Sequence, residues 1–155
     1  MRKLTSLLAL LLICAATAFA QTTAPKPLAM TAAELQKLKW IEGSWRGTGG
    51  GVPTFFERYK LDGTTLIVES LTDGKVTDTS RFELKNGQFR SGQPGMGSVA
   101  IALDDKGITF GNDQANRGTY RWERETADKW KAILQWPASG NRAAGERIYT
   151  MERMK

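Results

Sequence analysis

The sequence contains no histidine, and its only cysteine is Cys14. A chain without imidazole cannot form a His-ligated metal or haem site, and it cannot use histidine as the base of a catalytic triad. A chain with one cysteine cannot form an internal disulfide, so its fold must be stabilised by a hydrophobic core. We therefore expect no metal ion and no cofactor, and the sequence offers no set of catalytic residues.

Long hydrophobic runs are also absent, except for residues 7–16 near the start of the chain. This run of ten apolar residues follows a basic start at residues 1–3 and precedes an A-x-A motif at residues 18–20. These three features in this order are typical of a signal peptide, and the run is too short to cross a bilayer. We therefore predict a signal peptide over residues 1–20 with cleavage near Ala20. The mature chain is expected to lack a transmembrane segment and to be periplasmic or secreted.

Cleavage would also change the charge and the cysteine content. Cys14 raises the question of an acylated lipoprotein, but such a cysteine follows a small residue, and here it follows Ile13. Cys14 is therefore expected to leave with the signal peptide. Arg2 and Lys3 leave too, so that 20 basic and 16 acidic side chains remain and the net charge falls from +6 to +4. This small charge predicts weak, salt-sensitive attraction to anionic surfaces.

The remaining chain has the length of one domain. Residues 21–30 hold two prolines and are predicted to form a flexible leader, and residues 31–155 are predicted to form a single domain. Thr31 and Glu34 fit a capping box, and two leucines follow at a spacing of three. This pattern predicts a short helix over residues 32–39.

The helical period does not return after Trp40. Short runs rich in β-branched and aromatic residues alternate with turn pairs such as Asn86-Gly87, which favour tight hairpins. Eight to ten antiparallel strands with no helical pattern to cover a sheet predict an all-β, up-and-down β-barrel of eight to ten strands with a short N-terminal helix. A two-sheet sandwich is the alternative, and it would need longer crossing connections. The predicted strands lie near residues 41–49, 54–61, 64–71, 76–84, 88–91, 97–103, 107–111, 117–125, 129–136 and 146–154.

Side-chain alternation predicts which residues face the interior. The face of the second strand that carries Phe55 and Tyr59 also carries Glu57, a carboxylate that needs a partner if it is buried. The other predicted inward positions are Ile41, Gly43, Trp45 and Gly47 on the first strand, Val76, Ser80, Phe82 and Leu84 on the fourth, Val99, Ile101 and Leu103 on the sixth, Ile108 and Phe110 on the seventh, Tyr120 and Trp122 on the eighth, and Trp130, Ala132, Leu134 and Trp136 on the ninth.

The stretch Gly43-Ser44-Trp45 lies on the first predicted strand, directly after the short helix. A Gly-x-Trp in this place, followed by a meander of strands, resembles the lipocalin and calycin superfamily. The chain is also similar to compact bacterial lipocalin-like domains, many of unknown function, and more distantly to nitrobindin-type barrels, whose haem histidine it lacks. The resemblance implies an enclosed cavity, with Gly43 and Trp45 closing one end of the barrel and a late arginine packing over the indole. Arg147 and Arg153 are the candidates.

Three functions suit such a barrel. It could bind a small apolar or amphipathic molecule, with Glu57 and Tyr59 fixing its orientation. It could be a filled barrel without a ligand that acts as an envelope or partner-binding protein, or an isomerase or cyclase that uses Glu57 as a base. The sequence leaves the oligomeric state open. The candidates for lining a ligand site are Glu57, Tyr59, Phe82, Tyr120, Trp122, Trp136 and Tyr149.

Three further motifs have ordinary structural explanations. Residues 46–51 are glycine-rich like a phosphate loop, but no Gly-Lys-Ser/Thr follows, so a strand end or bulge is favoured. Residues 92–97 form a second glycine-rich loop, either a mobile lid over a cavity or a permissive hairpin connection. Arg117, Arg121 and Arg124 lie beside aromatic residues, as in proteins that bind single-stranded nucleic acid. Two glutamates interrupt this cluster, and we expect no nucleic-acid partner.

Overall fold

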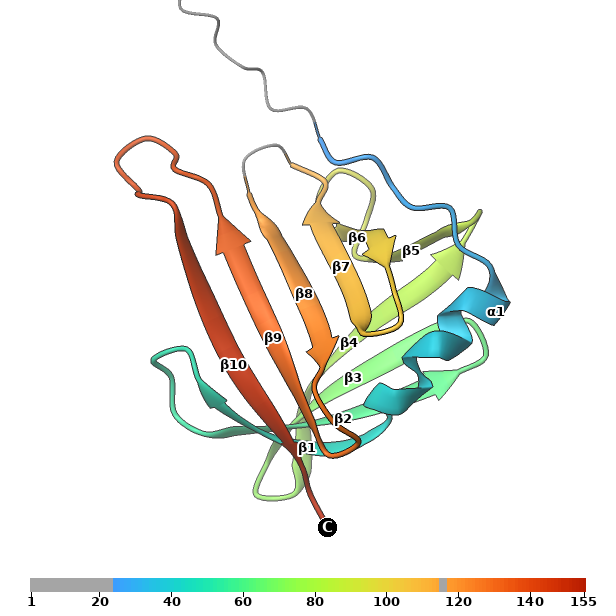
Figure 1. Ribbon diagram of the computed structural model, residues 1–155. Coiled ribbons are helices and arrows are strands. Elements are labelled where there is room, and N and C mark those ends of the chain that lie inside the picture. Colours follow the sequence, from blue (N-terminus) through green and yellow to red (C-terminus); the bar gives the residue numbers. More distant parts are fainter. Residues whose placement is uncertain (1–23, 115–116) are drawn as a thin grey trace, which may run out of the picture.

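Ten antiparallel strands form one closed barrel in the computed structural model, which describes residues 24–114 and 117–155 (Figure 1). Each strand pairs with its neighbours in sequence, and β1 pairs with β10 to close the barrel. The predicted all-β up-and-down barrel with a short N-terminal helix is therefore confirmed, and the predicted signal peptide, residues 1–20, lies outside the described residues. The strands are β1 (Gly43–Gly49), β2 (Phe55–Asp62), β3 (Thr65–Thr72), β4 (Lys75–Lys85), β5 (Gln88–Ser91), β6 (Ser98–Leu103), β7 (Gly107–Asn112), β8 (Thr119–Arg124), β9 (Lys129–Trp136) and β10 (Gly145–Arg153).

The helical segment begins at the predicted capping box. The Thr31 hydroxyl accepts a hydrogen bond from the backbone N–H of Glu34 at 3.2 Å, and the Glu34 carboxylate accepts one from the backbone N–H of Thr31 at 2.7 Å. Two orphan donors at the start of helix α1 (Ala32–Leu35) are satisfied in this way. The chain then tightens into a 3₁₀ turn, η1 (Gln36–Ile41). The first strand consequently begins at Gly43, two residues later than the sequence pattern predicted.

One face of this helical segment belongs to the barrel core. Leu35, Leu38 and Ile41 are fully or almost fully buried and pack in the same cluster as Trp45. Burying a leucine or isoleucine side chain stabilises a fold by about 1.5–3 kcal/mol, so the segment is a structural part of the barrel.

Trp45 lies at the closed end of the barrel, where none of its surface is exposed. Its indole Nε1–H donates to the Ile41 carbonyl at 2.7 Å, and its ring packs edge-on against Trp130 with centroids 6.0 Å apart. Because the one polar atom of the indole is satisfied inside the protein, the ring can be buried without an unpaired donor. The last turn of the helical segment and the first strand are thereby joined.

Arg153 covers the indole of Trp45. Its guanidinium carbon lies 4.2 Å from the ring centroid, and the two residues are direct partners across β1 and β10. The same guanidinium donates to the carbonyls of Glu42 at 2.8 Å and Trp40 at 3.1 Å. Gly43 has a φ of +123°, which residues with a side chain rarely adopt, and a Cβ there would lie 2.5 Å from Arg153 Nη1, so glycine is favoured at this position. These contacts are what the lipocalin resemblance implied for the end of the barrel.

Arg147, the other candidate for this contact, lies elsewhere. It is exposed near the start of β10, opposite Leu134 on β9. Six residues of extended strand separate it from Arg153, which is about 20 Å. Arg147 therefore lies toward the opposite end of the barrel and cannot reach Trp45.

Two strands depart from simple alternation. In β4 the register shifts opposite Ser70 and Leu71, and Val76, predicted to face inward, is 45% exposed. In β6 the register shifts between Ala100 and Ala102. Ala100, opposite Phe110, belongs to the core cluster, whereas Val99 is buried opposite Gly111 and lies outside that cluster. A bulge adds one residue to one strand, so the side chains before and after it do not follow one alternation pattern, which explains both errors.

The structure describes residues 24–30 of the predicted leader, and they contact the barrel. Leu28 donates its backbone N–H to the Ala100 carbonyl at 2.8 Å, and Met30 donates to the Gly87 carbonyl at 2.7 Å. Figure 1 shows this segment running past β5 and β6 before it enters α1. Pro25 lies against Gly111, where a Cβ would be 2.4 Å from the proline ring. Residues 24–30 are therefore attached to the barrel at several points.

Candidate ligand-binding cavity

The barrel contains a cavity of about 900 Å³ that is open to solvent. Its exposed lining residues, which mark the mouth, come from the β1–β2 loop (Val52, Pro53 and Thr54), from β4 (Ser80 and Arg81) and from Gly92. The inner lining consists mainly of aromatic and aliphatic side chains. This volume lies within the range of about 300–1,000 Å³ that is usual for small-molecule sites.

Trp122 is the centre of the aromatic wall. Its ring lies 5.2 Å from Phe82, 5.0 Å from Phe110 and 5.8 Å from Tyr59, centroid to centroid, and all three contacts are edge-on. β8 supplies this tryptophan, and its register with Ile108 and Ala132 directs it inward. Aromatic pairs prefer this arrangement, so the contacts hold Trp122 in place in the cavity wall.

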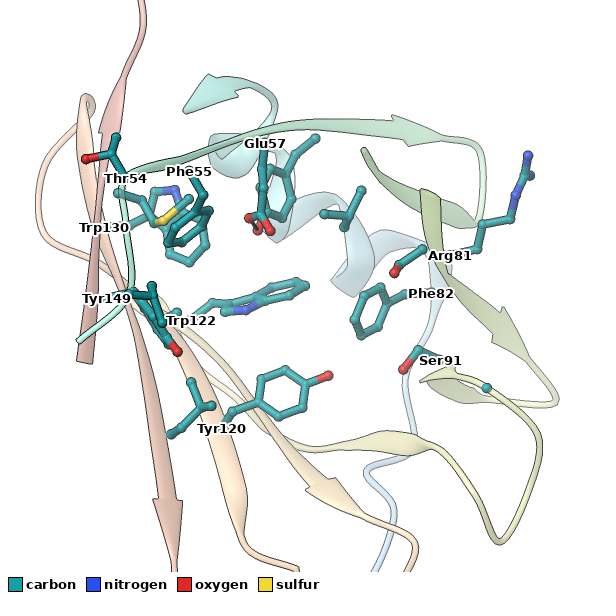
Figure 2. Close-up of a pocket in the computed structure, with 18 of the residues that line it drawn as sticks. Thr54, Phe55, Glu57, Arg81, Phe82, Ser91, Tyr120, Trp122, Trp130 and Tyr149 are labelled. Carbon is teal, nitrogen blue, oxygen red and sulfur yellow. Dashed lines mark hydrogen bonds between the residues drawn. The ribbon is translucent and has the colours of Figure 1, made fainter. Parts of the chain in front are cut away.

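Glu57 is the acidic residue that lines the cavity. β2 supplies it, directly opposite Trp45 on β1, and Figure 2 shows its side chain projecting into the cavity above Trp122. The Tyr59 hydroxyl donates a hydrogen bond to Glu57 Oε2 at 2.6 Å. A carboxylate and a phenol therefore form one polar group within an aromatic wall.

Burial sets the protonation of this pair. Loss of solvent raises the pKa of Glu57, and the hydrogen bond from Tyr59 opposes this effect in part. Burial, and next the negative charge of Glu57, hold the pKa of Tyr59 well above its ordinary value, so Tyr59 stays neutral and remains the donor. Burial also raises the pKa of Tyr120, against the smaller opposing effect of its hydrogen bonds with Ser98 and Ser91.

The raised pKa of Glu57 gives an expected pH dependence. A raised pKa means that the folded state binds the proton more tightly than the unfolded state, so the contribution of Glu57 to stability falls as the pH rises from 4.5 through the folded-state pKa. Glu57→Gln cannot ionise. The difference in the free energy of unfolding, variant minus wild type, should therefore increase over this pH range and then remain constant at higher pH. Urea melts of both proteins from about pH 4 to pH 7 measure the difference, and a difference that is constant with pH would contradict the burial of Glu57.

The structure brings six of the seven predicted lining residues to this cavity: Glu57, Tyr59, Phe82, Tyr120, Trp122 and Tyr149. Trp136 is not among the residues that line it. Its ring lies over Gly145, where a Cβ would be 2.7 Å away, and its Nε1–H donates to the Ala143 carbonyl at 3.2 Å. Trp136 ends β9, beyond the cavity wall, so facing inward was not enough to place it in the site.

Trp130, Val68, Ser91 and Met151 also line the cavity, although the sequence pattern did not indicate them as lining residues. Alternation along β9 had already placed Trp130 on the inward face. Alternation therefore indicated that Trp130 faces the interior. It could not indicate whether the side chain lies in the packed core or lines the cavity.

The glycine-rich loop at residues 92–97 borders the mouth through Gly92. The Asp113 carboxylate accepts hydrogen bonds from the backbone N–H groups of Gly95 at 3.1 Å and Gly97 at 3.2 Å, and it pairs with Arg90 at 2.8 Å. These bonds attach the loop to the end of β7. They favour the hairpin-connection alternative over the mobile lid.

The basic cluster on β8 is partly neutralised by acidic neighbours. The Arg121 guanidinium pairs with Asp104 at 2.9 Å and with Glu123 at 2.8 Å. The positive charge of Arg121 is therefore balanced by these two carboxylates. Arg117 donates to the Gln114 side chain at 2.9 Å. This arrangement gives the nucleic-acid alternative no support.

Within residues 24–114 and 117–155, no group of three or more His, Cys, Asp or Glu side chains is arranged to hold a metal ion. In the same residues, no helix has the length and the apolar character needed to cross a membrane.

Comparisons of the chain with protein-family models and with curated proteins found no match. The closed ten-stranded barrel is consistent with a calycin-like fold. The function is therefore argued from the geometry of the cavity.

Proposed function

We propose that this protein is an exported, lipocalin-like protein that binds a small apolar or amphipathic molecule in the barrel cavity. The observation that supports the proposal is the cavity of about 900 Å³, lined mainly by aromatic and aliphatic side chains, with Glu57 and Tyr59 as a hydrogen-bonded polar pair. A barrel filled by its own side chains, the main alternative, would leave no space of this size. The proposed export rests on the signal-peptide pattern of residues 1–20.

The lining has the composition of a small-molecule site. Such sites are mostly apolar and contain few polar groups, which fix the orientation of the ligand. Here Phe82, Trp122 and Trp130 supply apolar surface, and Glu57 with Tyr59 supplies the polar group. An isomerase or cyclase would use Glu57 as a base, and its raised pKa suits that role. Among the described residues, however, Tyr59 is the only hydrogen-bond partner of its carboxylate.

A cavity-filling substitution tests the proposal. Ala132 lines the cavity between Trp122 on β8 and Tyr149 on β10, so Ala132→Phe places a benzyl group where a ligand would lie. We expect the wild type to bind the neutral probe N-phenyl-1-naphthylamine with a rise in its fluorescence. Ala132→Phe should weaken this binding by about tenfold or more, which corresponds to about 1.4 kcal/mol.

Ile133→Phe is the matched control, because neighbouring residues of a strand face opposite sides of the sheet. It adds bulk to the same strand outside the cavity and should bind the probe like the wild type. Thermal melts check that both variants fold. A wild type that does not bind the probe, or equal binding by a folded Ala132→Phe variant, would contradict the proposal.

A further inference from the structure

Glu57 is a carboxylate without a basic partner. Among the described residues, no lysine or arginine lies within ion-pair distance of it, and its hydrogen bond comes from the neutral Tyr59. Arg81 is the other charged residue of the lining, but Figure 2 shows its guanidinium pointing away from the cavity. Because Phe82 faces inward on β4, the preceding residue must face outward. The charge inside the cavity is therefore negative.

A partly buried carboxylate without a counter-ion is costly, because the apolar wall replaces the water that would stabilise its charge. Desolvation accordingly raises the pKa of Glu57. A ligand that brings a positive charge would remove this cost. A ligand that brings a second negative charge would add to it.

The surrounding rings favour the same sign of charge. Tyr59, the hydrogen-bond donor to Glu57, packs edge-on against Trp122 at 5.8 Å and against Trp130 at 5.6 Å. The faces of aromatic rings are negative and attract ammonium groups, most strongly when the contact is dry. The carboxylate and the rings around it are thus complementary to a cation.

We infer that the cavity takes an amphipathic amine, with its ammonium group beside Glu57 and its apolar body among the aromatic rings. The position of Glu57 also gives the orientation. Glu57 lies opposite Trp45, the residue at the closed end, whereas Phe55 lies opposite Gly47, nearer the mouth. The ammonium group therefore enters first, and the apolar body extends past Phe55 and Tyr149 toward the exposed β1–β2 loop. This inference rests on the proposed ligand binding and adds the chemical class of the ligand.

Three compounds with the same apolar chain test the inference: octylamine, octan-1-ol and octanoate. Each is titrated at pH 7 against the wild-type protein loaded with N-phenyl-1-naphthylamine, and displacement of the probe gives its affinity. A primary amine is protonated at this pH. We expect octylamine to bind about tenfold or more tightly than octan-1-ol, because of the ion pair and the contact with the rings, and octanoate to bind weakest.

Glu57→Gln keeps the shape of the side chain and removes its charge. In this variant the preference for octylamine over octan-1-ol, measured as the ratio of the two affinities, should disappear. A preference for the amine that persists in the variant would overturn the role of Glu57. The order of the three compounds on the wild type does not depend on a variant, so the inference remains testable if Glu57→Gln does not fold.

The remaining outcomes separate this inference from the proposed function. If the probe binds and the three compounds displace it equally, or if octanoate binds best, the preference for an amine is wrong and ligand binding stands. If neither the probe nor any of the three compounds binds, the proposed function is wrong and this inference falls with it.

Discussion

Trp45→Ala is expected to lower the free energy of unfolding by about 3–5 kcal/mol, the usual cost of removing a large aromatic side chain from a core. Trp45 is fully buried, and its Nε1–H donates to the Ile41 carbonyl, so the substitution leaves a cavity and an acceptor without its donor. Small domains have a total stability of about 5–15 kcal/mol, which makes this a large fraction of the whole.

Denaturant melts of the wild type and of Trp45→Ala measure this effect. Trp136→Ala is the matched control, since it removes the same side chain from a half-buried position at the end of β9. It should cost clearly less. Equal losses in the two variants would mean that Trp45 has no special role in closing the barrel.

Arg153→Ala is expected to cost about 2–4 kcal/mol, more than an arginine packed on an aromatic ring usually contributes. The guanidinium covers Trp45 and also donates to the carbonyls of Glu42 and Trp40, which would lose their partner. Arg147→Ala removes the same kind of side chain from an exposed position on the same strand. It should change the stability by no more than about 0.5 kcal/mol.

A double-mutant cycle connects these two substitutions. Because Arg153 lies 4.2 Å from the ring of Trp45, their effects should not add, and the coupling should be at least about 0.5 kcal/mol. Arg147 and Trp45 should be additive. Additive effects for Arg153 and Trp45 would show that the contact does not stabilise the closed end.

The all-β barrel could be predicted from the sequence because every local sequence pattern indicated the same architecture. The turn pairs, the runs of β-branched residues and the capping box at Thr31 each specified one element, and no later helical pattern conflicted with a barrel. The pairing of Trp45 with a late arginine could be expected from the lipocalin resemblance. The choice between Arg147 and Arg153 could not be made, because both lie on the same face of β10. Only the register, in which Trp45 lies opposite Arg153, decides it.

Bulges and contacts between distant segments leave little trace in the local sequence. The bulges in β4 and β6 add residues to a strand without a glycine or proline to signal them, so Val76 and Val99 were assigned to the wrong face. Leu28 and Met30, in the predicted leader, donate hydrogen bonds to barrel carbonyls that lie far away in sequence. Long-range pairing of this kind leaves no local pattern.

The candidate site could likewise be predicted only in part from the sequence. Alternation placed Glu57 among inward aromatic residues, and the structure adds what alternation could not supply, namely its hydrogen-bond donor Tyr59 and the outward direction of Arg81. Trp136 was included because it faces inward, but the cavity ends before it is reached. Depth along the barrel axis depends on the stagger of all ten strands, which no single strand encodes.

The proposal that the cavity holds a ligand is tested most directly by the five tryptophan indole N–H signals in a two-dimensional NMR titration with N-phenyl-1-naphthylamine. Trp122 and Trp130 line the cavity, whereas Trp40 and Trp136 do not. We expect the signals of Trp122 and Trp130 to shift and then to saturate as the probe binds, and those of Trp40 and Trp136 to stay in place. Shifts confined to Trp40 and Trp136, or no saturable shift of any indole signal, would contradict ligand binding inside the barrel.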